Sequence, residues 1–220
     1  MRRAILDAAR ELFVAEGFRT VSIRRIAERI EYSPGAIYGY FESKDDIFYA
    51  LAEEGFRLLE AALEQVLALR PASALAAVRI GFWEYYQFTK THPQYFELMF
   101  LDRTVPSIAE AWDRFSFVHG MLQRAALLIT RCVDEGSMPA DTNAEVAFHI
   151  LLAAVHGVAV LGLCKRVAPD EDPDLLARDT LEAALAGLRA GVHTSFSASA
   201  LARPGPPSVA SSPGDSDVPS

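Results

Sequence analysis

The chain has 220 residues, which is long enough for one larger domain or for a small domain joined to a larger one. With 51% hydrophobic and 23% charged residues, and only thirteen Gly and twelve Pro, the composition excludes collagenous and wholly disordered chains. The two cysteines, Cys132 and Cys164, are too few for a disulfide framework or a four-thiolate zinc site. Acids at Asp7 and Glu11 interrupt any apolar leader, so we expect a cytoplasmic protein.

The net charge of -8 is unevenly distributed along the chain. Residues 1–45 carry eight Lys/Arg and seven Asp/Glu, a balance of +1, whereas residues 46–220 carry thirteen against twenty-two, a balance of -9. This asymmetry indicates a short N-terminal unit that can approach a polyanion and a larger acidic body that stays away from it.

The N-terminal unit has the pattern of three helices. Apolar residues at helical spacing predict a first helix that ends at Gly17. Ser22 can cap a second, short helix, and Ser33 followed by Pro34 opens a third that runs through Tyr40. The apolar positions are Ile5, Ala8, Ala9, Leu12 and Phe13 in the first helix and Ile23, Ile26, Ala27 and Ile30 in the second.

The rest of the chain is also predicted to be helical. Ser43 and Asp46 resemble a capping box that starts a long helix toward Leu69. Prolines and glycines then divide the sequence into helices near 73–91, 94–101, 107–135, 142–166 and 173–192. Thr142 with Glu145 forms a capping-box pattern, and Asp172 precedes a proline at the first helical position. No segment alternates with period two, so the predicted fold class is all-α.

Two segments near the C-terminus have distinctive compositions. The apolar stretch from Phe148 to Cys164 is interrupted by His149 and His156 and is shorter than a bilayer span of roughly 20 residues. We therefore predict a buried helix and no membrane partner. Residues 197–220 contain seven Ser, five Pro and two Gly, so we predict a disordered tail over 196–220. The chain before this tail divides into predicted domains over 1–48 and 49–195.

Two short helices joined by a tight turn have the proportions of a helix-turn-helix, whose second helix enters the major groove of DNA. The helix N-termini at Ser22, Ser33 and Ser43 offer free N–H groups to phosphates, and Lys44 stands just inside the third.

These residues resemble a known family. The run Ser33-Pro34-Gly35-Ala36-Ile37-Tyr38-Gly39-Tyr40-Phe41-Glu42-Ser43-Lys44, preceded by Gly17-Phe18, Ser22 and Ile26-Ala27, resembles the DNA-binding domain of the TetR (tetracycline-repressor) family over residues 4–50. The resemblance implies a homodimer on a near-palindromic double-stranded DNA operator, with a helical domain that binds a small-molecule effector and dimerises through its last two long helices. It also implies phosphate contacts by Ser22, Tyr38 and Lys44, a groove-facing pair at Gly35 and Ala36, and a role for Tyr40 beside them.

The sequence departs from the family pattern at the turn. Glu31-Tyr32 stands where the family usually has Gly-Val, and glycine is favoured there if the backbone needs a positive φ. Pro34 and Gly39 have no side-chain hydrogen-bonding groups, so the third helix can read few bases directly. We therefore expect Arg24 and Arg25, helped by Arg2 and Arg3, to contact phosphates or the minor groove. The complete predicted DNA-binding set is Ser22, Arg24, Arg25, Ser33, Pro34, Gly35, Ala36, Tyr38, Tyr40 and Lys44.

Aromatic residues crowd one part of the predicted body. Eleven of the twenty-two aromatics fall between residues 82 and 117, which indicates either a bulky core or an apolar ligand pocket. We predict a pocket for an unknown apolar or aromatic effector, because the family resemblance favours one. The candidate lining residues are Phe82, Trp83, Tyr86, Phe100, Trp112, Phe115 and His119.

Other functions are less well supported by the sequence. His149 and His156 are seven residues apart rather than four, so we predict no metal site and no cofactor. The absence of a nucleophile elbow or a phosphate-binding glycine loop argues against an enzyme. Small residues in the helix 142–166 and leucines in 173–192 suit a dimer interface or a monomeric core. The prediction is a ligand-responsive, homodimeric transcriptional repressor whose effector changes the spacing of the two recognition helices. The alternative is a helical carrier that has lost DNA binding.

Overall fold

The computed structural model describes residues 1–111 and 113–191, and every regular element in that part of the chain is a helix. The predicted all-α class is therefore confirmed. The predicted tail at 196–220 and the candidate pocket residue Trp112 lie outside the described residues.

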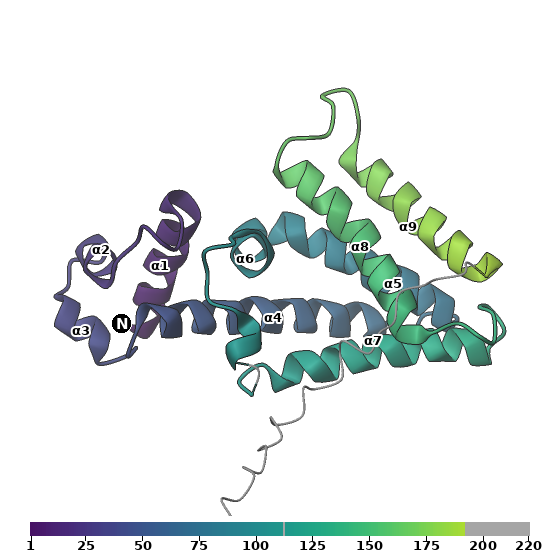
Figure 1. Cartoon of the computed structure of the whole chain (residues 1–220), viewed down its shortest axis with the longest axis horizontal. Helices are drawn as coiled ribbons and strands as arrows, with labels where there is room; N and C mark the ends of the chain where they lie inside the picture. Colours follow the sequence, from purple (N-terminus) through teal and green to yellow (C-terminus); the bar gives the residue numbers. More distant parts are fainter. Residues whose placement is uncertain (112, 192–220) are drawn as a thin grey trace, which may run out of the picture.

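The first three helices form a small unit at one end of the molecule (Figure 1), which we call the reading head: α1 (Arg2–Glu16), α2 (Ile23–Arg29) and α3 (Pro34–Tyr38). The predicted caps are confirmed. The Ser22 hydroxyl accepts from the backbone N–H of Arg25 at 3.1 Å, and the Ser33 hydroxyl accepts from that of Ala36 at 3.3 Å. The helix α3 ends at Tyr38, two residues before the predicted end. The fully buried side chains of the reading head include Ile5, Phe13, Ile26 and Ile37.

The helix α4 (Lys44–Ala68) leads out of the reading head into the body of the molecule (Figure 1). Its capping box is confirmed, because the Ser43 hydroxyl accepts from the Asp46 N–H at 3.0 Å and donates to the Asp46 carboxylate at 3.0 Å. The predicted domain boundary after residue 48 falls inside this helix. The two parts of the chain are thus joined by continuous helix rather than by a flexible linker.

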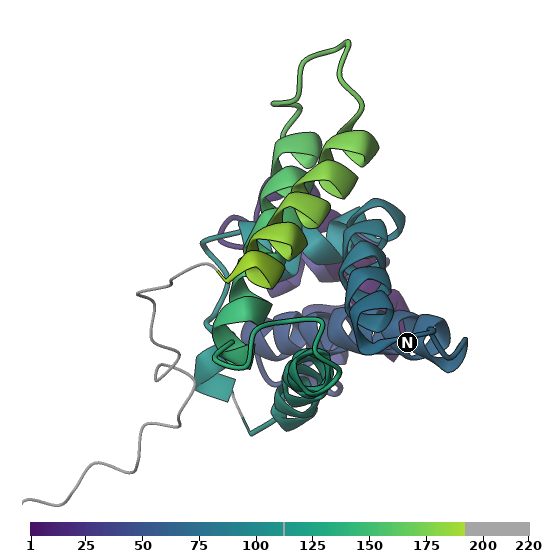
Figure 2. The same ribbon diagram turned by 90° about the vertical axis from the view of Figure 1, so that its right-hand side faces the viewer.

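The body packs around α4 and α5. Its elements are α5 (Ala74–Thr91), α6 (Pro93–Phe96), the π-helical turn η1 (Glu97–Leu101), the 3₁₀ turn η2 (Ile108–Ala111), α7 (Ser116–Asp134), α8 (Ala144–Leu163) and α9 (Pro173–Ala190). The last two helices, α8 and α9, lie side by side and project beyond the other helices (Figures 1 and 2).

Two boundary predictions are wrong. Residues 107–135 do not form one helix, because α7 begins only at Ser116. The preceding residue, Phe115, is fully buried, with its ring 6.2 Å from that of Tyr49 and 5.9 Å from that of Phe56, so the chain turns inward before α7 starts. The cap of α8 is Asn143 rather than Thr142, since its side chain accepts from the N–H groups of residues 145 and 146 at 3.1 and 3.0 Å.

The helix α8 is only partly buried, which corrects the sequence prediction. Its mean hydropathy is 2.2, and by length and composition it is the one helix in the described part of the chain that could cross a membrane. Only 39% of its apolar window is buried within the chain. Ala153, Gly157 and Leu161, spaced four residues apart, are exposed along one stripe. Composition alone does not distinguish a membrane span from an interface helix.

Candidate DNA-binding surface and effector cavity

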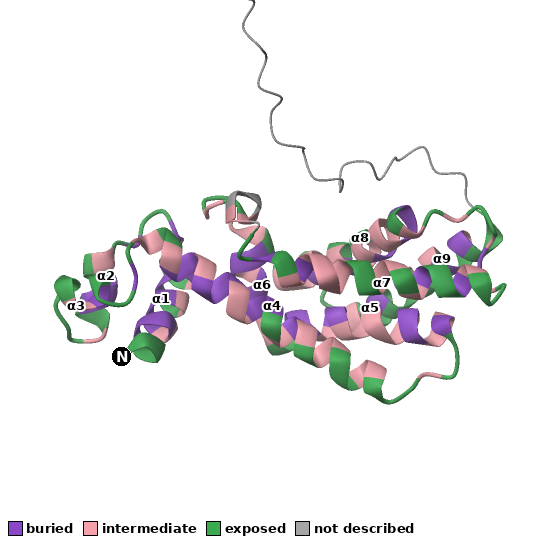
Figure 3. Cartoon of the chain, turned by 90° about the horizontal axis from the view of Figure 1, so that it is seen from below, coloured by how far each residue is buried: buried purple, intermediate pink, exposed green. Residues whose placement is uncertain are grey.

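The recognition helix α3 presents an open face to solvent. Figure 3 shows that most of α3 is exposed, while Ile37 points into the core of the reading head and is fully buried. The tyrosines Tyr38 and Tyr40 are 56% and 50% exposed, so their hydroxyls are available to a partner. A Cβ added at Gly35 would meet only the Ser33 hydroxyl, at 3.9 Å. This face can therefore approach a flat polyanionic surface closely.

The arginines of α2 are exposed but engaged in ion pairs. The Nε of Arg24 lies 3.0 Å from a Glu28 oxygen, and a guanidinium nitrogen of Arg25 lies 3.0 Å from a Glu16 oxygen. Exposed pairs of this kind contribute only about 0–1 kcal/mol each, so a phosphate can replace the carboxylate at little cost. Both arginines are placed where they can contact DNA after such an exchange.

Lys44 is placed differently from the expectation that it contacts phosphate. Its Nζ donates to the carbonyl oxygens of Phe18 and Val21 at 2.8 and 2.9 Å, and it lies over the ring of Phe18 at 4.3 Å from the centroid. The side chain is half-buried. Lys44 therefore ties the loop between α1 and α2 to the start of α4, which fixes the position of Ser22.

The turn between α2 and α3 contains the strain that the sequence suggested. Glu31 has φ = 60°, in the left-handed region that favours glycine. The amide of Tyr32 donates to the carbonyl of Ala27 at 3.0 Å, which closes the turn. Tyr32 is 52% exposed at the entrance to α3. The predicted DNA-binding set did not include Tyr32. The signal in the sequence was an aromatic residue at a position where the family usually has Val.

The body contains a cavity of about 320 Å³ between α4, α5, α7 and α8. Of the predicted lining residues, Phe82 and Phe100 do line it. Most other walls are also apolar or aromatic: Phe56, Leu59, Leu63, Val78, Val118, Met121, Leu122, Leu128, Phe148 and Leu152. The volume and the predominance of apolar side chains are typical of a small-molecule site.

Four predicted pocket residues lie elsewhere. Trp83 and Tyr86 face α9, where the Arg178 guanidinium lies over the Trp83 ring at 4.6 Å and the Tyr86 hydroxyl donates to Asp174 at 2.9 Å. Phe115 is not a wall of the cavity but fills the core beside Phe56, and His119 lies 2.8 Å from Gln123 on the same helix. The aromatic cluster is thus shared between cavity and core, because adjacent positions on α5 lie about 100° apart around the helix axis and point to different neighbours.

Three polar side chains at the cavity, Glu60, Tyr85 and Arg124, were not among the predicted lining residues. A Glu60 oxygen accepts from Arg124 at 2.6 Å, and the Tyr85 hydroxyl lies 2.8 Å from Nδ1 of His156. Burial raises the pKa of Tyr85 and lowers the pKa of His156, so both groups are neutral at pH 7. The apolar spacing of Phe56, Leu59 and Leu63 was the signal that α4 contributes a wall.

The two histidines of α8 have separate neighbours. His149 lies 2.7 Å from the carbonyl of Glu145, and His156 faces Tyr85, so the two histidines of α8 do not converge. Within residues 1–111 and 113–191 there is no group of three or more His, Cys, Asp or Glu that could hold a metal ion.

Comparison with known proteins agrees with this geometry. Residues 5–51 match the family described as bacterial regulatory proteins, tetR family. The transcriptional repressor AcnR of Corynebacterium efficiens is 30% identical over 155 residues, which cover 70% of this chain and 77% of that protein. The transcriptional repressor Rv1474c of Mycobacterium tuberculosis is 45% identical over 53 residues, and that match spans 24% of this chain and only 28% of that protein.

The fold of most of the chain is also shared with a solved structure. The transcriptional regulator FadR of Bacillus subtilis, crystallised in complex with stearoyl-CoA, superposes with a TM-score of 0.68 at 17% identity, covering 88% of this chain and all of that one. The match to AcnR extends beyond the reading head into the body. The chain therefore belongs to the TetR family of bacterial regulatory proteins, and it is a DNA-binding transcriptional regulator rather than an enzyme.

Proposed function

We propose that this protein is a ligand-responsive repressor that binds a near-palindromic operator as a homodimer in the cytoplasm and releases it when an apolar or aromatic effector fills the cavity. The observation that carries the proposal is the course of α4. This helix begins in the reading head at Lys44 and, further along, supplies the cavity walls Phe56, Leu59 and Leu63. An occupant that shifts α4 changes the orientation of the recognition helix with it.

The proposed DNA-contacting residues are those predicted from the sequence, without Lys44 and with Tyr32 added. Ser22 and Ser33 offer helix N-termini to phosphates, Tyr38 and Tyr40 offer hydroxyls, and Gly35 permits close approach. Lys44 acts by holding the loop before α2. With few hydrogen-bonding side chains on α3, we expect much of the specificity to come from DNA shape.

The DNA-binding part is tested by fluorescence anisotropy on the DNA upstream of the protein's own gene, across a salt series. Tyr38→Phe removes one hydroxyl and should weaken binding about fivefold, the equivalent of one hydrogen bond. Tyr86→Phe is the matched control, since that hydroxyl faces Asp174 in the body, and it should leave the affinity unchanged. If the wild-type protein binds a palindromic site no better than scrambled DNA at low salt, the carrier alternative replaces the repressor.

The homodimer is proposed from the exposed apolar surface of α8 and α9. Ala153, Gly157 and Leu161 are exposed on α8, and Leu175 and Leu176, near the start of the neighbouring helix α9, are 58% and 37% exposed. An apolar face of this kind is favourable only when a partner covers it. Two copies joined through this face would present two recognition helices to half-sites about one turn of DNA apart, roughly 34–36 Å.

The interface is tested by measuring the molecular mass in solution. A Cβ at Gly157 would meet nothing within 4 Å, so Gly157→Glu should fold yet place a charge in the interface and yield monomers. Leu127→Glu, at a 61% exposed position on α7, is the control and should leave the mass unchanged. Dimers of the Gly157→Glu protein would show that another surface is used.

The effector class follows from the cavity walls. Its aromatic and aliphatic side chains favour an apolar ligand or the apolar part of a larger one, and the FadR structure of the same fold was crystallised with stearoyl-CoA, whose acyl chain is of this kind. A panel of alkyl and aromatic compounds should contain members that raise the melting temperature and also lower DNA affinity. Ligands that stabilise the protein without changing DNA affinity would contradict the regulatory part of the proposal.

A further inference from the structure

The segment formed by α6 and η1, residues 93–101, lies between the cavity and the reading head. On the cavity side, Phe100 lines the cavity, and its ring is 5.1 Å from that of Phe96. Both rings also pack against His156 of α8, at 5.1 Å for Phe96 and 5.6 Å for Phe100. This side of the segment is therefore part of the packed wall around the cavity.

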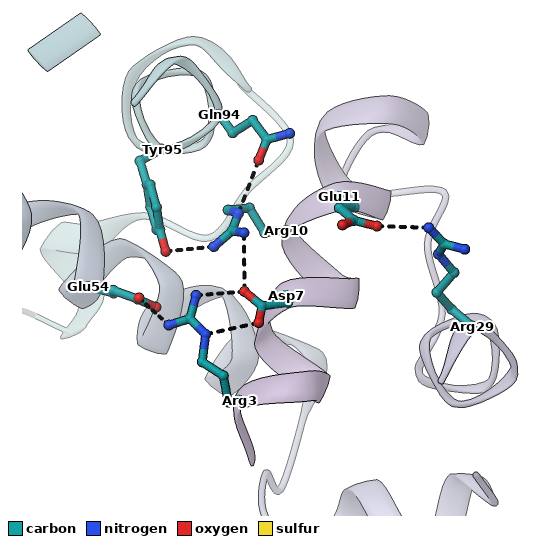
Figure 4. Close-up of polar contacts among 8 residues, drawn as sticks. All are labelled: Arg3, Asp7, Arg10, Glu11, Arg29, Glu54, Gln94 and Tyr95. Atoms are coloured by element: carbon teal, nitrogen blue, oxygen red, sulfur yellow. Dashed lines mark hydrogen bonds and ion pairs between the residues drawn. The ribbon is translucent and has the colours of Figure 1, made fainter. Parts of the chain in front are cut away.

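The opposite side of the same segment binds α1 through Arg10 (Figure 4). The Arg10 guanidinium donates to the Gln94 side chain at 3.1 Å and to the Tyr95 hydroxyl at 2.8 Å. It also lies over the Tyr95 ring, 5.1 Å from the centroid. The Arg10 side chain is only 18% exposed, and its bond to Tyr95 is part-buried, so that bond is stronger than one made by a fully exposed arginine, whereas the bond to Gln94 is exposed.

A second contact follows directly after η1. The carboxylate of Asp102 accepts from the backbone N–H of Phe18, in the loop between α1 and α2, at 3.2 Å. Phe18 is the residue whose carbonyl binds Lys44, so this loop is held from both α4 and the end of η1. Arg10 and Asp102 thus connect one short segment to two successive parts of the reading head.

One ion pair links α1 to α4 directly. Arg3 of α1 binds Glu54 of α4 (Figure 4). This pair keeps the reading head attached to α4 even if the contacts to α6 and η1 change. The contacts of Arg10 and Asp102, together with a bond between Arg3 and Tyr95, are therefore the part of the attachment that depends on the position of the cavity wall.

We propose that Arg10 and Asp102 are positioning residues that set the angle of the reading head, and that the segment of α6 and η1 transmits cavity occupancy to them. This rests on the proposed ligand response and gives it a route through α1, beside the one through α4. An occupant that displaces Phe100 moves the segment, alters the bonds at Gln94, Tyr95 and Phe18, and favours a conformation that does not fit the operator.

The experiment uses a substitution that fills the cavity from within. Gly81 lines the cavity, and a Cβ there would meet nothing within 4 Å, so Gly81→Leu places a permanent apolar occupant in it. Reduced binding of the fluorescent apolar probe N-phenyl-1-naphthylamine verifies the filling. DNA affinity is measured by anisotropy for the full chain with and without Gly81→Leu, in the wild-type, Arg10→Met and Asp102→Asn backgrounds.

Gly81→Leu should weaken DNA binding about tenfold in the wild-type background and less than about threefold in the two variant backgrounds. Arg131→Met, which removes an exposed guanidinium from α7, is the matched control and should leave the tenfold effect intact. If Gly81→Leu also weakens DNA binding tenfold in the Arg10→Met and Asp102→Asn backgrounds, this route is overturned and the proposed function stays in place.

A readout that does not need DNA separates the remaining outcomes. Because the Phe18 amide is bonded to Asp102, Gly81→Leu should increase its hydrogen exchange rate severalfold, and a merely structural role of Asp102 would leave that rate unchanged. Unchanged exchange and unchanged DNA affinity in a protein whose cavity is filled would overturn both this route and the proposed ligand response.

Discussion

The ammonium group of Lys44 lies 2.8 Å from the carbonyl oxygen of Phe18 and 4.3 Å from the centroid of the Phe18 ring. A second carbonyl, that of Val21, accepts from the same group at 2.9 Å. A third carbonyl, that of Arg19, lies 3.5 Å away, so all three donors face the loop before α2, and we expect Lys44 to contribute to DNA binding chiefly by placing the N-terminus of α2.

Lys44→Ala should therefore lower the free energy of unfolding by about 2 kcal/mol, the range of hydrogen bonds from a charged donor. It should also weaken DNA binding while leaving the slope of log affinity against log salt unchanged. Lys44→Gln, which keeps a donor but removes the charge, should recover part of both losses. A slope shallower by about one in both variants would instead indicate a direct phosphate contact.

Glu31 is a site where a substitution should increase stability. Its φ of 60° costs a residue with a side chain about 1 kcal/mol relative to glycine, so Glu31→Gly should raise the free energy of urea unfolding by up to that amount. Glu31→Gln keeps the backbone cost and removes only the charge, and it should leave stability unchanged. Equal stabilisation by both substitutions would assign the effect to charge repulsion.

Local features of the fold were accessible from the sequence because they depend on neighbouring residues. The caps at Ser22, Ser33 and Ser43 and the strained turn at Glu31 each follow from residues within one turn of the chain. The reading head was also covered by a recognisable motif. The predicted domain boundary after residue 48 lies inside α4, so no break between helices marks where the reading head ends and the body begins.

The cavity was harder to predict because its walls come from four helices that are distant in sequence. Aromatic density marked the right region but could not show that Phe82 points inward while Trp83 points toward α9. Burial of Phe115 likewise depends on Tyr49 and Phe56, which lie far earlier in the chain. Such directions are set by tertiary packing rather than by local pattern.

Gly55 marks the closest approach of α4 to the segment of α6 and η1. A Cβ at this position would collide with the Met99 sulfur and lie 3.1 Å from the Tyr95 ring. Gly55→Ala should therefore destabilise the protein by about 1–3 kcal/mol, as overpacking of a core does. Gly81→Ala is the control within a helix, where the open space and better helix propensity predict a gain of up to about 1 kcal/mol. Urea unfolding of both variants checks this, and a neutral Gly55→Ala would mean that the two helices separate easily.

His156 should make stability fall as the pH drops. Burial lowers the pKa of this histidine in the folded protein below the unfolded value of about 6.5, so the unfolded state binds the proton more readily. The contribution of the neutral imidazole is complete above pH 6.5 and is lost as the pH falls below it. The slope stays under the one-proton limit of about 1.4 kcal/mol per pH unit, because the two states differ by less than one bound proton at this histidine.

Melting temperatures between pH 7.5 and 5.5 test this directly. In His156→Gln, the melting temperature should fall less between pH 7.5 and 5.5 than it does in the wild type. At pH 7.5 it should already be lower, because the substitution disturbs the packing with Phe96 and Phe100. Tyr85→Phe removes the hydroxyl that faces Nδ1 but keeps the imidazole buried, so its pH dependence should match that of the wild type. If the melting temperature of His156→Gln falls as much as that of the wild type, groups other than His156 cause the pH dependence. The packing of α8 beside Phe100 would then be insensitive to proton uptake.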